Sequence, residues 1–411
     1  MELKQGYKQT EVGVIPEDWK IEILNDLTTR IGDGIHSTPK YSNNGEYYFV
    51  NGNNLVNGKI IVSNDTKKVS NEEYHYHKRE LNDSTILISI NGTIGNIALY
   101  GNENILIGKS AAYLNLNNKI KKLFLYQVLQ SKFINRYFEN ELTGSTIKNL
   151  GLGVIRNTPI PLPTLPEQTA IANALSDMDA LISQTEKLIE KKKAIKQGAM
   201  QELLKPKEGW VTKTLGEIGV ISGAGVDKKI NANENAVRLL NYMDVYKRDF
   251  IYSNELNHWV TAPANKLANC SVKQGDVFFT PSSETRTDIG LAAVAMEDIS
   301  NAVYSYHVMR FRLLLDWDIK FKVYIFQTKH FLDQTEKMCE GGGKRYVLTM
   351  PKFRALLITY PESIIEQQEI SWKLWDMDQE LKLLSTKLTK LKQQKQGMMQ
   401  ALLTGKIRLE S

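Results

Sequence analysis

Five loops in this chain of 411 residues concentrate side chains that can hydrogen-bond to phosphates or to the edges of nucleobases. Arginine and lysine can donate to guanine, asparagine can pair with adenine, and hydroxyls and glycine N–H groups can bind phosphate. Turn formation alone also explains the composition of any one of these loops. They are NGNN (51–54), NGTIGN (91–96), TGSTIKNLG (143–151), PSSETRTDIG (281–290) and EGGGKRYVLT (340–349).

All of the residues that we select for their donors and acceptors lie within these loops, except Lys40, which precedes them. We take as candidate nucleic-acid contacts Lys40, Asn53, Asn91, Thr93, Ser145, Lys148, Ser283, Arg286, Lys344 and Arg345.

The sequence offers no comparable set of catalytic residues. It has no GxxxxGK[ST] phosphate loop, no GxSxG nucleophile turn and no glycine-rich cofactor motif. His75 and His77 could share a face of a strand, but no acidic or thiol partner for a zinc ion stands near them. We therefore predict no catalytic residue, no metal site and no cofactor in this chain.

The five loops lie outside a long stretch of sequence that occurs twice in the chain. Adding 199 to each position from 167 to 204 gives a second copy without a gap, and 16 of the 38 pairs are identical. Apolar residues recur every three or four positions in both copies, which predicts two long helices with a narrow apolar seam. Thr164 before Glu167 and Ser363 before Glu366 have the spacing of a capping box.

Each helix should be about 57 Å long at ~1.5 Å per residue. A domain of about 150 residues, with a radius of gyration near 15 Å, separates them. Because that domain is smaller than the helix is long, the second helix should start near the end of the first, and the pair should run antiparallel. The alternative is that each helix packs only on its own domain.

The segments outside the helices form two related blocks. Trp19 and Trp210 occupy matching places at an offset of 191, and the loops at 281–290 and 340–349 occupy the places of those at 91–96 and 143–151. We expect strands at 47–50, 60–62, 85–90 and 276–280, and single short helices at 126–137 and 321–331. The predicted domains are 1–163, 164–205, 206–362 and 363–405, of which the second and fourth are the helices.

Composition agrees with a globular protein. The chain is 42% apolar and 24% charged, its formal net charge is +6, and its two cysteines form no disulfide framework. It has no apolar run long enough to cross a membrane and begins with a polar, charged segment, so we expect a cytoplasmic protein. The mild positive charge is compatible with a polyanionic partner.

Several segments together resemble the specificity subunit of type I restriction–modification systems. They are LPTLPEQTAIANALSDMDALI (162–182) with its second copy, the opening YKQTEVGVIPEDW, the segment STILISINGTIGNIALY and the GSTIKNL loop. The resemblance covers essentially the full chain, although the second copy has Ile364 and Ile365 where the first has Leu165 and Pro166.

The resemblance implies an α+β fold in which two target-recognition domains are separated by two helices packed as an antiparallel coiled coil, with a pseudo-two-fold internal repeat. Each domain would read one half of a bipartite, asymmetric site in double-stranded DNA, and the helices would set the gap. Two methyltransferase subunits and the translocase–nuclease subunits would be partners, and S-adenosylmethionine, ATP and Mg²⁺ would bind to them. The residues assigned to partner docking are Glu167, Gln168, Asp177, Asp179, Glu366, Gln367, Asp376 and Asp378.

Three other functions remain open at this stage. The chain could be a coiled-coil scaffold that organises a protein complex without reading DNA. It could be a nuclease with dispersed catalytic groups, or it could recognise RNA, for which Tyr74 and Tyr76 or Tyr304 and Tyr306 could stack on bases.

Overall fold

The computed structural model describes residues 5–143, 148–223 and 225–409. The chain divides into two compact units. Unit 1 comprises Met1–Glu186 and Thr386–Ser411, and unit 2 comprises Lys187–Ser385. Each unit therefore contains one of the two sequence blocks together with a part of both long helices.

The two predicted helices are present and equal in length. They are α5 (Leu165–Leu203) and α12 (Ile364–Leu402), with 39 residues each. Thr164 Oγ1 accepts a hydrogen bond from Glu167 N, and Ser363 Oγ accepts one from Glu366 N, both at 3.4 Å. The return bond of the predicted capping box is missing, because both glutamate carboxylates bond to tryptophan side chains instead.

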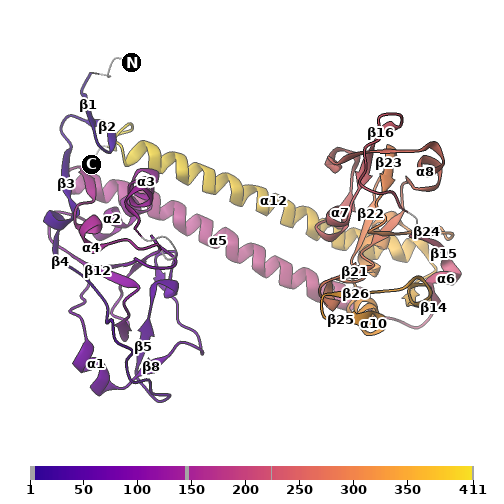
Figure 1. Ribbon diagram of the computed structural model, residues 1–411, viewed down its shortest axis with the longest axis horizontal. Helices are drawn as coiled ribbons and strands as arrows, with labels where there is room; N and C mark the ends of the chain where they lie inside the picture. Colours follow the sequence, from indigo (N-terminus) through magenta and orange to yellow (C-terminus); the bar gives the residue numbers. More distant parts are fainter. Residues whose placement is uncertain (1–4, 144–147, 224, 410–411) are drawn as a thin grey trace. The chain divides into compact units, whose positions relative to one another are not determined.

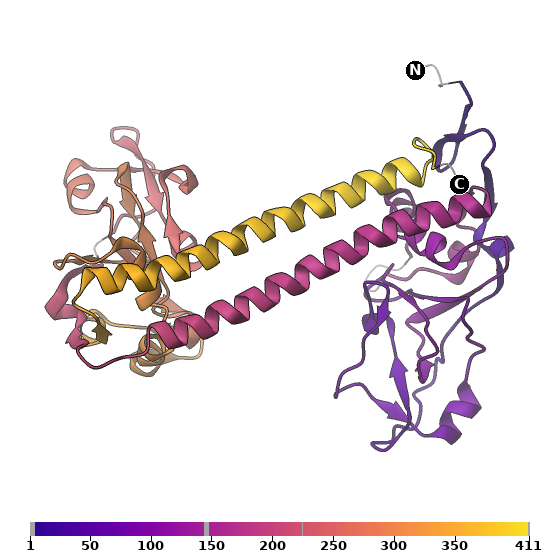
Figure 2. The same ribbon diagram turned by 180° about the vertical axis from the view of Figure 1, so that it is seen from behind.

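Each unit joins the start of one helix to the end of the other. In unit 1, Leu175 of α5 and Leu402 of α12 belong to one hydrophobic core. In unit 2, Leu374 of α12 shares a core with Leu204, which follows α5. Figures 1 and 2 show these helix ends side by side within each unit. The helices therefore run antiparallel. The first turns of each helix also pack on the block of strands and short helices in the same unit, which we call the recognition block. The structure thus combines the two arrangements considered from the sequence, helix on helix and helix on its own domain.

Ion pairs join the helices along the seam. Asp179 pairs with Lys395 at 2.6 Å in unit 1, and Asp378 pairs with Lys196 at 2.5 Å in unit 2. The same offset of 199 relates both aspartates and both lysines. The repeat is therefore a pseudo-two-fold relation in structure as well as in sequence.

Unit 1 contains a four-stranded antiparallel sheet in the order β10-β9-β12-β4. Tyr113 of β12 lies opposite Leu87 of β9 and Gly32 of β4. A side chain at Gly32 would clash with the Tyr113 ring, which lies 2.8 Å from the place of its Cβ. The strands are β4 (Thr28–Asp33), β9 (Thr85–Ser89), β10 (Ile97–Leu99) and β12 (Ala111–Leu116).

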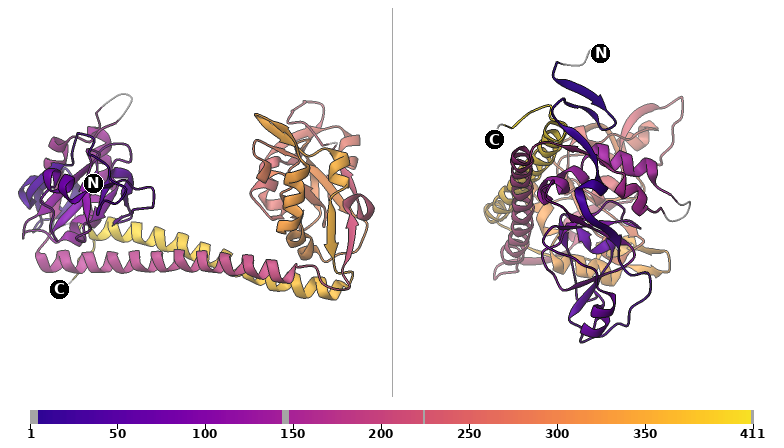
Figure 3. Two further views of the ribbon diagram at one scale, coloured as in Figure 1. Left: turned by 90° about the horizontal axis from the view of Figure 1, so that it is seen from below. Right: turned by 90° about the vertical axis from the view of Figure 1, so that its left-hand side faces the viewer.

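The main sheet of unit 2 repeats this order with one added strand, as β15-β24-β20-β22-β17. Phe311 of β24 lies opposite Ile221 of β15 and Val277 of β20, and all three are buried. Figure 3 shows the strands of this unit lying on one side of the helix ends. The strands are β15 (Gly219–Ser222), β17 (Phe250–Ile251), β20 (Val277–Phe279), β22 (Ala292–Ala295) and β24 (Met309–Leu313).

A second sheet in each unit is built around a parallel pair, β5 with β11 in unit 1 and β16 with β23 in unit 2. The order is β11-β5-β8 in unit 1 and β18-β16-β23-β19 in unit 2. The two blocks are thus copies of one fold. The strands are β5 (Tyr47–Val50), β8 (Lys68–Val69), β11 (Ile105–Ile107), β16 (Asn235–Leu240), β18 (Trp259–Ala262), β19 (Ser271–Val272) and β23 (Ile299–Tyr304).

Short two-stranded ladders and one small three-stranded sheet, β21-β26-β25, complete the strands. β3 pairs with β13 just before α5, and β14 pairs with β27 just before α12, so the lead into each helix is tied to the start of its block. The strands are β1 (Tyr7–Thr10), β2 (Gly13–Pro16), β3 (Lys20–Ile23), β6 (Leu55–Val56), β7 (Lys59–Ile60), β13 (Pro159–Leu162), β14 (Val211–Thr214), β21 (Ser282–Ser283), β25 (Glu340–Gly342), β26 (Arg345–Val347) and β27 (Leu357–Tyr360).

The single helices predicted at 126–137 and 321–331 were wrong, because each is a pair. Ser131 Oγ accepts from Ile134 N and begins a new helix, while the apolar spacing continues across the break. The strand expected at 60–62 is only the two-residue β7. The short α-helices are α1 (Asn71–His77), α2 (Lys122–Leu129), α3 (Lys132–Glu141), α4 (Leu152–Arg156), α6 (Leu215–Ile218), α7 (Tyr242–Tyr246), α8 (Ala264–Asn269), α9 (Ile319–Ile325), α10 (Lys329–Met338) and α11 (Met350–Arg354).

Four 3₁₀ turns occur among the described residues, namely η1 (Leu24–Leu27), η2 (Gly52–Asn54), η3 (Ser253–Glu255) and η4 (Arg286–Asp288). None of the described helices is long and apolar enough to pass through a membrane. His75 and His77 lie on helix α1 and not on a strand. The expectation that no acidic residue stands near them was wrong, because His77 Nε2 lies 3.4 Å from Glu73 Oε1 on the same helix.

Candidate nucleic-acid interface

The candidate residues of unit 2 lie together on a small three-stranded sheet, β21-β26-β25. Ser283 of β21 lies opposite Tyr346 of β26. The guanidinium of Arg286, at the start of η4, lies 4.7 Å from the centre of the Tyr346 ring, a cation–π contact. The ring therefore supports Arg286 from one side and leaves the arginine exposed.

Lys344 lies in the turn between β25 and β26, and Arg345 is the first residue of β26, the central strand of the same sheet. The turn between β25 and β26 contains Gly343, whose φ of 71° favours glycine, and both cations are exposed. Arg345 Nη2 donates to Ser282 Oγ at 2.9 Å. All four predicted residues of this unit are thus brought into one cluster.

Arg286, Lys344 and Arg345 place three exposed cationic side chains at this cluster. Burial, and then the charges of Arg345 and Lys228, lower the pKa of His307 below its ordinary value. A group of exposed cations attracts an anion such as phosphate.

Two tyrosines next to the cluster were not predicted from the sequence. Tyr242 and Tyr246 are one helical turn apart on α7 and their rings stack with centroids 5.9 Å apart. The Tyr242 hydroxyl interacts with Ser283, while burial raises its pKa. Only the spacing of four residues on a helix could have indicated this pair.

In unit 1, two candidate residues line one open hollow and a third lies next to it in the sequence. Gly92, Thr93 and Lys148 line it, and Asn91 forms an isolated antiparallel bridge with Asn149 beside it. Thr93 and Lys148 are exposed. Ser145 lies outside the described residues.

The other two candidates of unit 1 are placed differently. Asn53 is exposed on η2, and its neighbour Gly52 packs against Ser89 at the end of β9, directly before the loop at 91–96. Lys40 is exposed on another loop, where its backbone N–H donates to Glu73 Oε1 of α1 at 2.9 Å. In the described part of the chain, no hydrogen bond links Lys40 with Asn91 or Thr93.

The predicted correspondence of the loops is confirmed. In unit 1 the loop after β9 bridges to the loop before α4, through Asn91 and Asn149. In unit 2 the loop after β20 pairs with the segment before α11, through Ser283 and Tyr346. The same two segments of the fold therefore form the candidate surface in both units, with different side chains.

The residues assigned to partner docking divide by burial. Glu167, Gln168 and Gln367 are buried, and Glu366 is half-buried. Trp19 Nε1 donates to Glu167 Oε2 at 3.1 Å, and Trp210 Nε1 donates to Glu366 Oε1 at 3.0 Å. These glutamates hold the recognition block on its helix.

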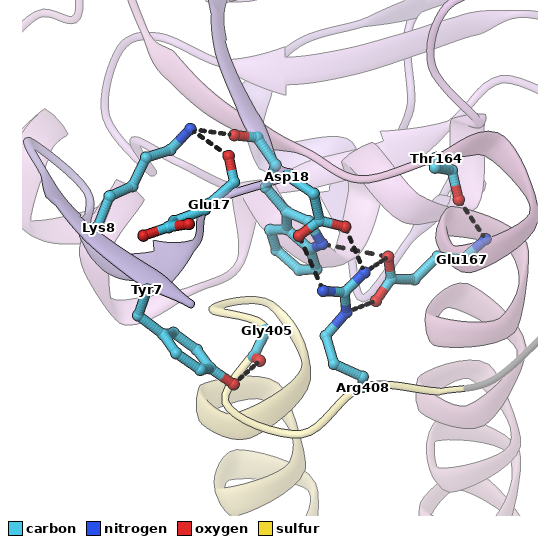
Figure 4. A network of polar contacts seen from close by, with 9 residues as sticks. Tyr7, Lys8, Glu17, Asp18, Thr164, Glu167, Gly405 and Arg408 are labelled. Atoms are coloured by element: carbon cyan, nitrogen blue, oxygen red, sulfur yellow. Dashed lines mark hydrogen bonds and ion pairs between the residues drawn. The ribbon is translucent and has the colours of Figure 1, made fainter. Parts of the chain in front are cut away.

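An arginine near the C-terminus completes the contact in unit 1. Arg408 pairs with both oxygens of Glu167, at 2.5 and 2.9 Å, and with both oxygens of Asp18, at 2.9 Å each. Tyr7 OH donates to Gly405 O at 3.0 Å beside it (Figure 4). Sequence analysis missed Arg408, because its partners lie 241 and 390 residues away.

The two glutamines form equivalent bonds. Gln168 Oε1 accepts from Lys121 N at 2.8 Å, and Gln367 Oε1 accepts from Asp318 N at 3.0 Å. Their amide nitrogens donate to the carbonyls of Pro163 and Pro361. Both side chains thus satisfy backbone groups at the lead into each helix.

The aspartates fall into two classes. Asp179 accepts from Gln127 and Asp378 accepts from Tyr324, in addition to their lysine partners. Asp177 and Asp376 are exposed. Docking of a partner protein by any of the eight residues stays a prediction, and six of them have partners within their own unit.

Comparison with known proteins now gives the class. The model of the type I restriction modification DNA specificity domain matches the chain twice, at residues 16–197 and 207–393. The chain belongs to this family, and it is a non-catalytic, DNA-recognising specificity subunit of a type I restriction–modification system.

Relatives and solved structures agree. The type I restriction enzyme MjaVIII specificity subunit of Methanocaldococcus jannaschii is 24% identical over 99% of this chain and 97% of its own length. The EcoBI specificity subunit of Escherichia coli is 25% identical over 43% of this chain and 38% of its own. The type I S subunit from M. genitalium has the same fold, with a TM-score of 0.58, 18% identity and 98% coverage of both chains.

Proposed function

We propose that each unit reads one half of an interrupted, asymmetric sequence in double-stranded DNA, and that α5 and α12 set the distance between the halves. The observation that carries this proposal is the contrast within the repeat. Both units share one sheet order and one pair of candidate segments, yet the residues on those segments differ. One frame with two different surfaces suits two different half-sites.

The segments of unit 2 offer Arg286, Lys344 and Arg345 to the DNA, and those of unit 1 offer Asn91, Thr93 and Lys148. Arginine suits guanine edges and asparagine suits adenine edges in the major groove, while lysine and hydroxyls suit phosphates. Asn53, Lys40 and Ser145 are further contacts of unit 1 in this proposal.

The chemistry belongs to partner subunits. Two methyltransferase subunits dock on the helices, bind S-adenosylmethionine, and each methylates N6 of an adenine that is flipped out of its half-site. Translocase–nuclease subunits supply restriction with ATP and Mg²⁺. The assembled system acts in the cytoplasm, where the DNA of the cell and of an invader are both accessible.

Loop variants test the DNA contact. Changing Lys344 and Arg345 together to alanine should weaken DNA binding of the assembled complex and make it less dependent on salt, by about one unit of slope for each phosphate that the variant no longer binds. Alanine at Lys273, an exposed lysine next to β19 and away from these segments, is the matched control. Unchanged affinity and unchanged slope would show that these loops do not touch DNA.

Shortened helices test the spacer. Removing one heptad from each helix at equivalent places, residues 184–190 and 383–389, keeps the three-four seam in phase. It shortens each helix by about 10.5 Å, which is roughly three base-pair steps. The tolerated gap should shrink by about that amount while both half-sequences stay the same. A gap that does not change contradicts the spacer role.

A further inference from the structure

Unit 1 contains a second hollow, at the place where its recognition block meets both long helices. The hollow lies among the β6–β7 hairpin, α2, α5 and α12, and its volume is about 690 Å³. Sites for small molecules have volumes of about 300–1,000 Å³. All the residues that line this hollow belong to unit 1, and none of them is a candidate nucleic-acid contact.

Aromatic rings of the chain itself occupy the equivalent place in unit 2. The rings of Phe250 on β17 and Trp375 on α12 meet edge to face, with centroids 4.8 Å apart. The Nζ atom of Lys320 on α9 lies 4.5 Å from the centre of the Trp375 ring, a cation–π contact. Unit 2 thus has two rings and one lysine packed together between its recognition block and its helix.

Each member of this cluster corresponds to a residue that lines the hollow of unit 1. Equivalent backbone bonds in the two units and the offset of 199 between the helices define the correspondence. No ring stands at any of the three positions in unit 1. The hollow therefore lies where unit 2 holds an indole and a phenyl ring. The pairs are Lys59 with Phe250, Leu123 with Lys320, and Ser176 with Trp375.

The walls of the hollow suit a ring that has a polar edge. Leu99, Leu123 and Ile182 supply apolar contacts, and Tyr126 supplies an aromatic ring, against which a second ring packs favourably. Burial, and then the charge of Asp179, raise the pKa of Tyr126 to about 12. The Tyr126 hydroxyl therefore stays protonated at neutral pH and can donate a hydrogen bond.

The charges around the hollow favour an anion. Asp179 pairs with Lys395, and Glu186 pairs with Lys392, both at 2.6 Å. Lys59, which also lines the hollow, is exposed and makes no hydrogen bond or ion pair with any described residue. Three lysines thus face two carboxylates, and one positive charge is left for a ligand.

We infer that this hollow binds a planar aromatic carboxylate, with its ring in the place that Phe250 and Trp375 fill in unit 2 and its carboxylate on the ammonium of Lys59. The bound ring contacts the recognition block and both helices at once. Because the unfolded chain has no such hollow, the ligand stabilises unit 1 by mass action and leaves unit 2 unchanged. This inference is independent of the reading of DNA.

Titration calorimetry of the full chain with indole-3-acetate as the probe tests the site. One equivalent should bind, with a dissociation constant of about 1 mM or tighter, as expected for a ligand of roughly 13 non-hydrogen atoms. Hydrogen exchange resolved by peptide should then slow in unit 1 alone. Absence of saturable binding, or equal protection of both units, overturns the inference.

A variant that fills the hollow tests its position. Lys59→Phe with Ser176→Trp gives unit 1 the aromatic residues of unit 2, and it should weaken binding by about tenfold or more because the new rings take the place of the ligand. Leu181→Trp is the matched control. It adds the same indole to α5 at an exposed position outside the hollow, about 140° around the helix from Ser176, and should bind as the wild type does. A filled variant that binds as well as the wild type overturns the site.

A second variant tests the carboxylate separately and does not depend on the filled variant folding. Lys59→Ala removes an exposed side chain and should weaken the binding of indole-3-acetate by about twofold to fivefold. Uncharged indole should bind equally to this variant and to the wild type. Equal affinities of the two proteins for indole-3-acetate would overturn the assignment of an anionic ligand.

Discussion

In both units a hydrogen bond from a tryptophan to a glutamate attaches the recognition block to the helices, but a different cation neutralises the glutamate in each unit. Trp19 donates to Glu167 in unit 1 and Trp210 donates to Glu366 in unit 2. The cation on Glu167 is Arg408, bound through two nitrogens, whereas Glu366 has Lys207 at 3.7 Å.

The difference between the two units follows from chain connectivity. In unit 2 the segment between the end of α5 and Trp210 is continuous, so peptide bonds already hold the block to the helix end. In unit 1 the end of α12 and the start of the block belong to opposite ends of the chain. Arg408 joins them by binding Asp18 and Glu167 at once (Figure 4). A bidentate arginine thus replaces a covalent connection.

The two units should differ most in the stability that they lose when the glutamate carboxylate is removed. Glu167→Ala leaves the Trp19 N–H and half of the Arg408 guanidinium without partners, which should cost unit 1 on the order of 3 kcal/mol. Glu366→Ala, at the half-exposed equivalent, should cost about 1 kcal/mol. Hydrogen exchange resolved by peptide would measure the loss in each unit separately. Equal losses would show that connectivity is irrelevant to the anchor.

Substitution of Arg408 should have the next largest effect on stability. Arg408→Ala should destabilise unit 1 by about 2 kcal/mol, since Glu167 keeps only the Trp19 bond. Arg408→Lys should recover part of this loss, because lysine supplies charge without the two-pronged geometry. Denaturant unfolding of the full chain checks both. If lysine restores full stability, charge alone holds the junction and the bidentate geometry is unimportant.

Substitution of Lys207, the corresponding cation of unit 2, should have little effect on stability. Lys207 is exposed and Glu366 is half-buried, and ion pairs at the surface contribute about 0.2–1 kcal/mol. Lys207→Ala should therefore lower the unfolding free energy of unit 2 by less than about 1 kcal/mol. A loss as large as that of Arg408→Ala would remove the contrast between the units.

The smallest effect concerns a carboxyl that only unit 2 contains. Asp249 stands where unit 1 has Gly58, and each backbone carbonyl accepts from the strand beside it. Burial raises the pKa of Asp249. A raised pKa in the folded state means that stability is greatest below the ordinary carboxyl value and falls as pH rises through the folded value.

Asp249→Asn should therefore raise the unfolding free energy of unit 2 at neutral pH, with a smaller gain in acid. Unfolding curves of wild type and variant at several pH values test this. The same gain at every pH would mean that ionisation of Asp249 is not the cause.

The sequence predicted what is local or repeated. The helices follow from their three-four spacing, and the paired loops follow from the offset between blocks. The side-chain contacts that hold these elements together could not be predicted, because contacts such as Arg408 with Glu167 join residues far apart in the chain. Identity between the copies also has more than one cause. Gln168 and Gln367 both satisfy backbone groups within their units, whereas a Cβ at Gly198 or Gly397 would meet no atom of the described residues within 4 Å.

The breaks within short elements were also beyond the sequence pattern. Ser131 ends α2 and begins α3 although apolar residues continue at helical spacing on both sides. A single serine hydroxyl decides the break there, and the same residue type is common within helices.

Mapping methylated adenines in the DNA of cells that carry the complete system tests the central claim most directly. Two unlike half-sequences at a fixed gap are expected, each with one methylated adenine. A chain with altered loops 281–290 and 340–349 should change only one of the two halves. A single uninterrupted sequence, or a change in both halves at once, would contradict the reading of one half-site by each unit.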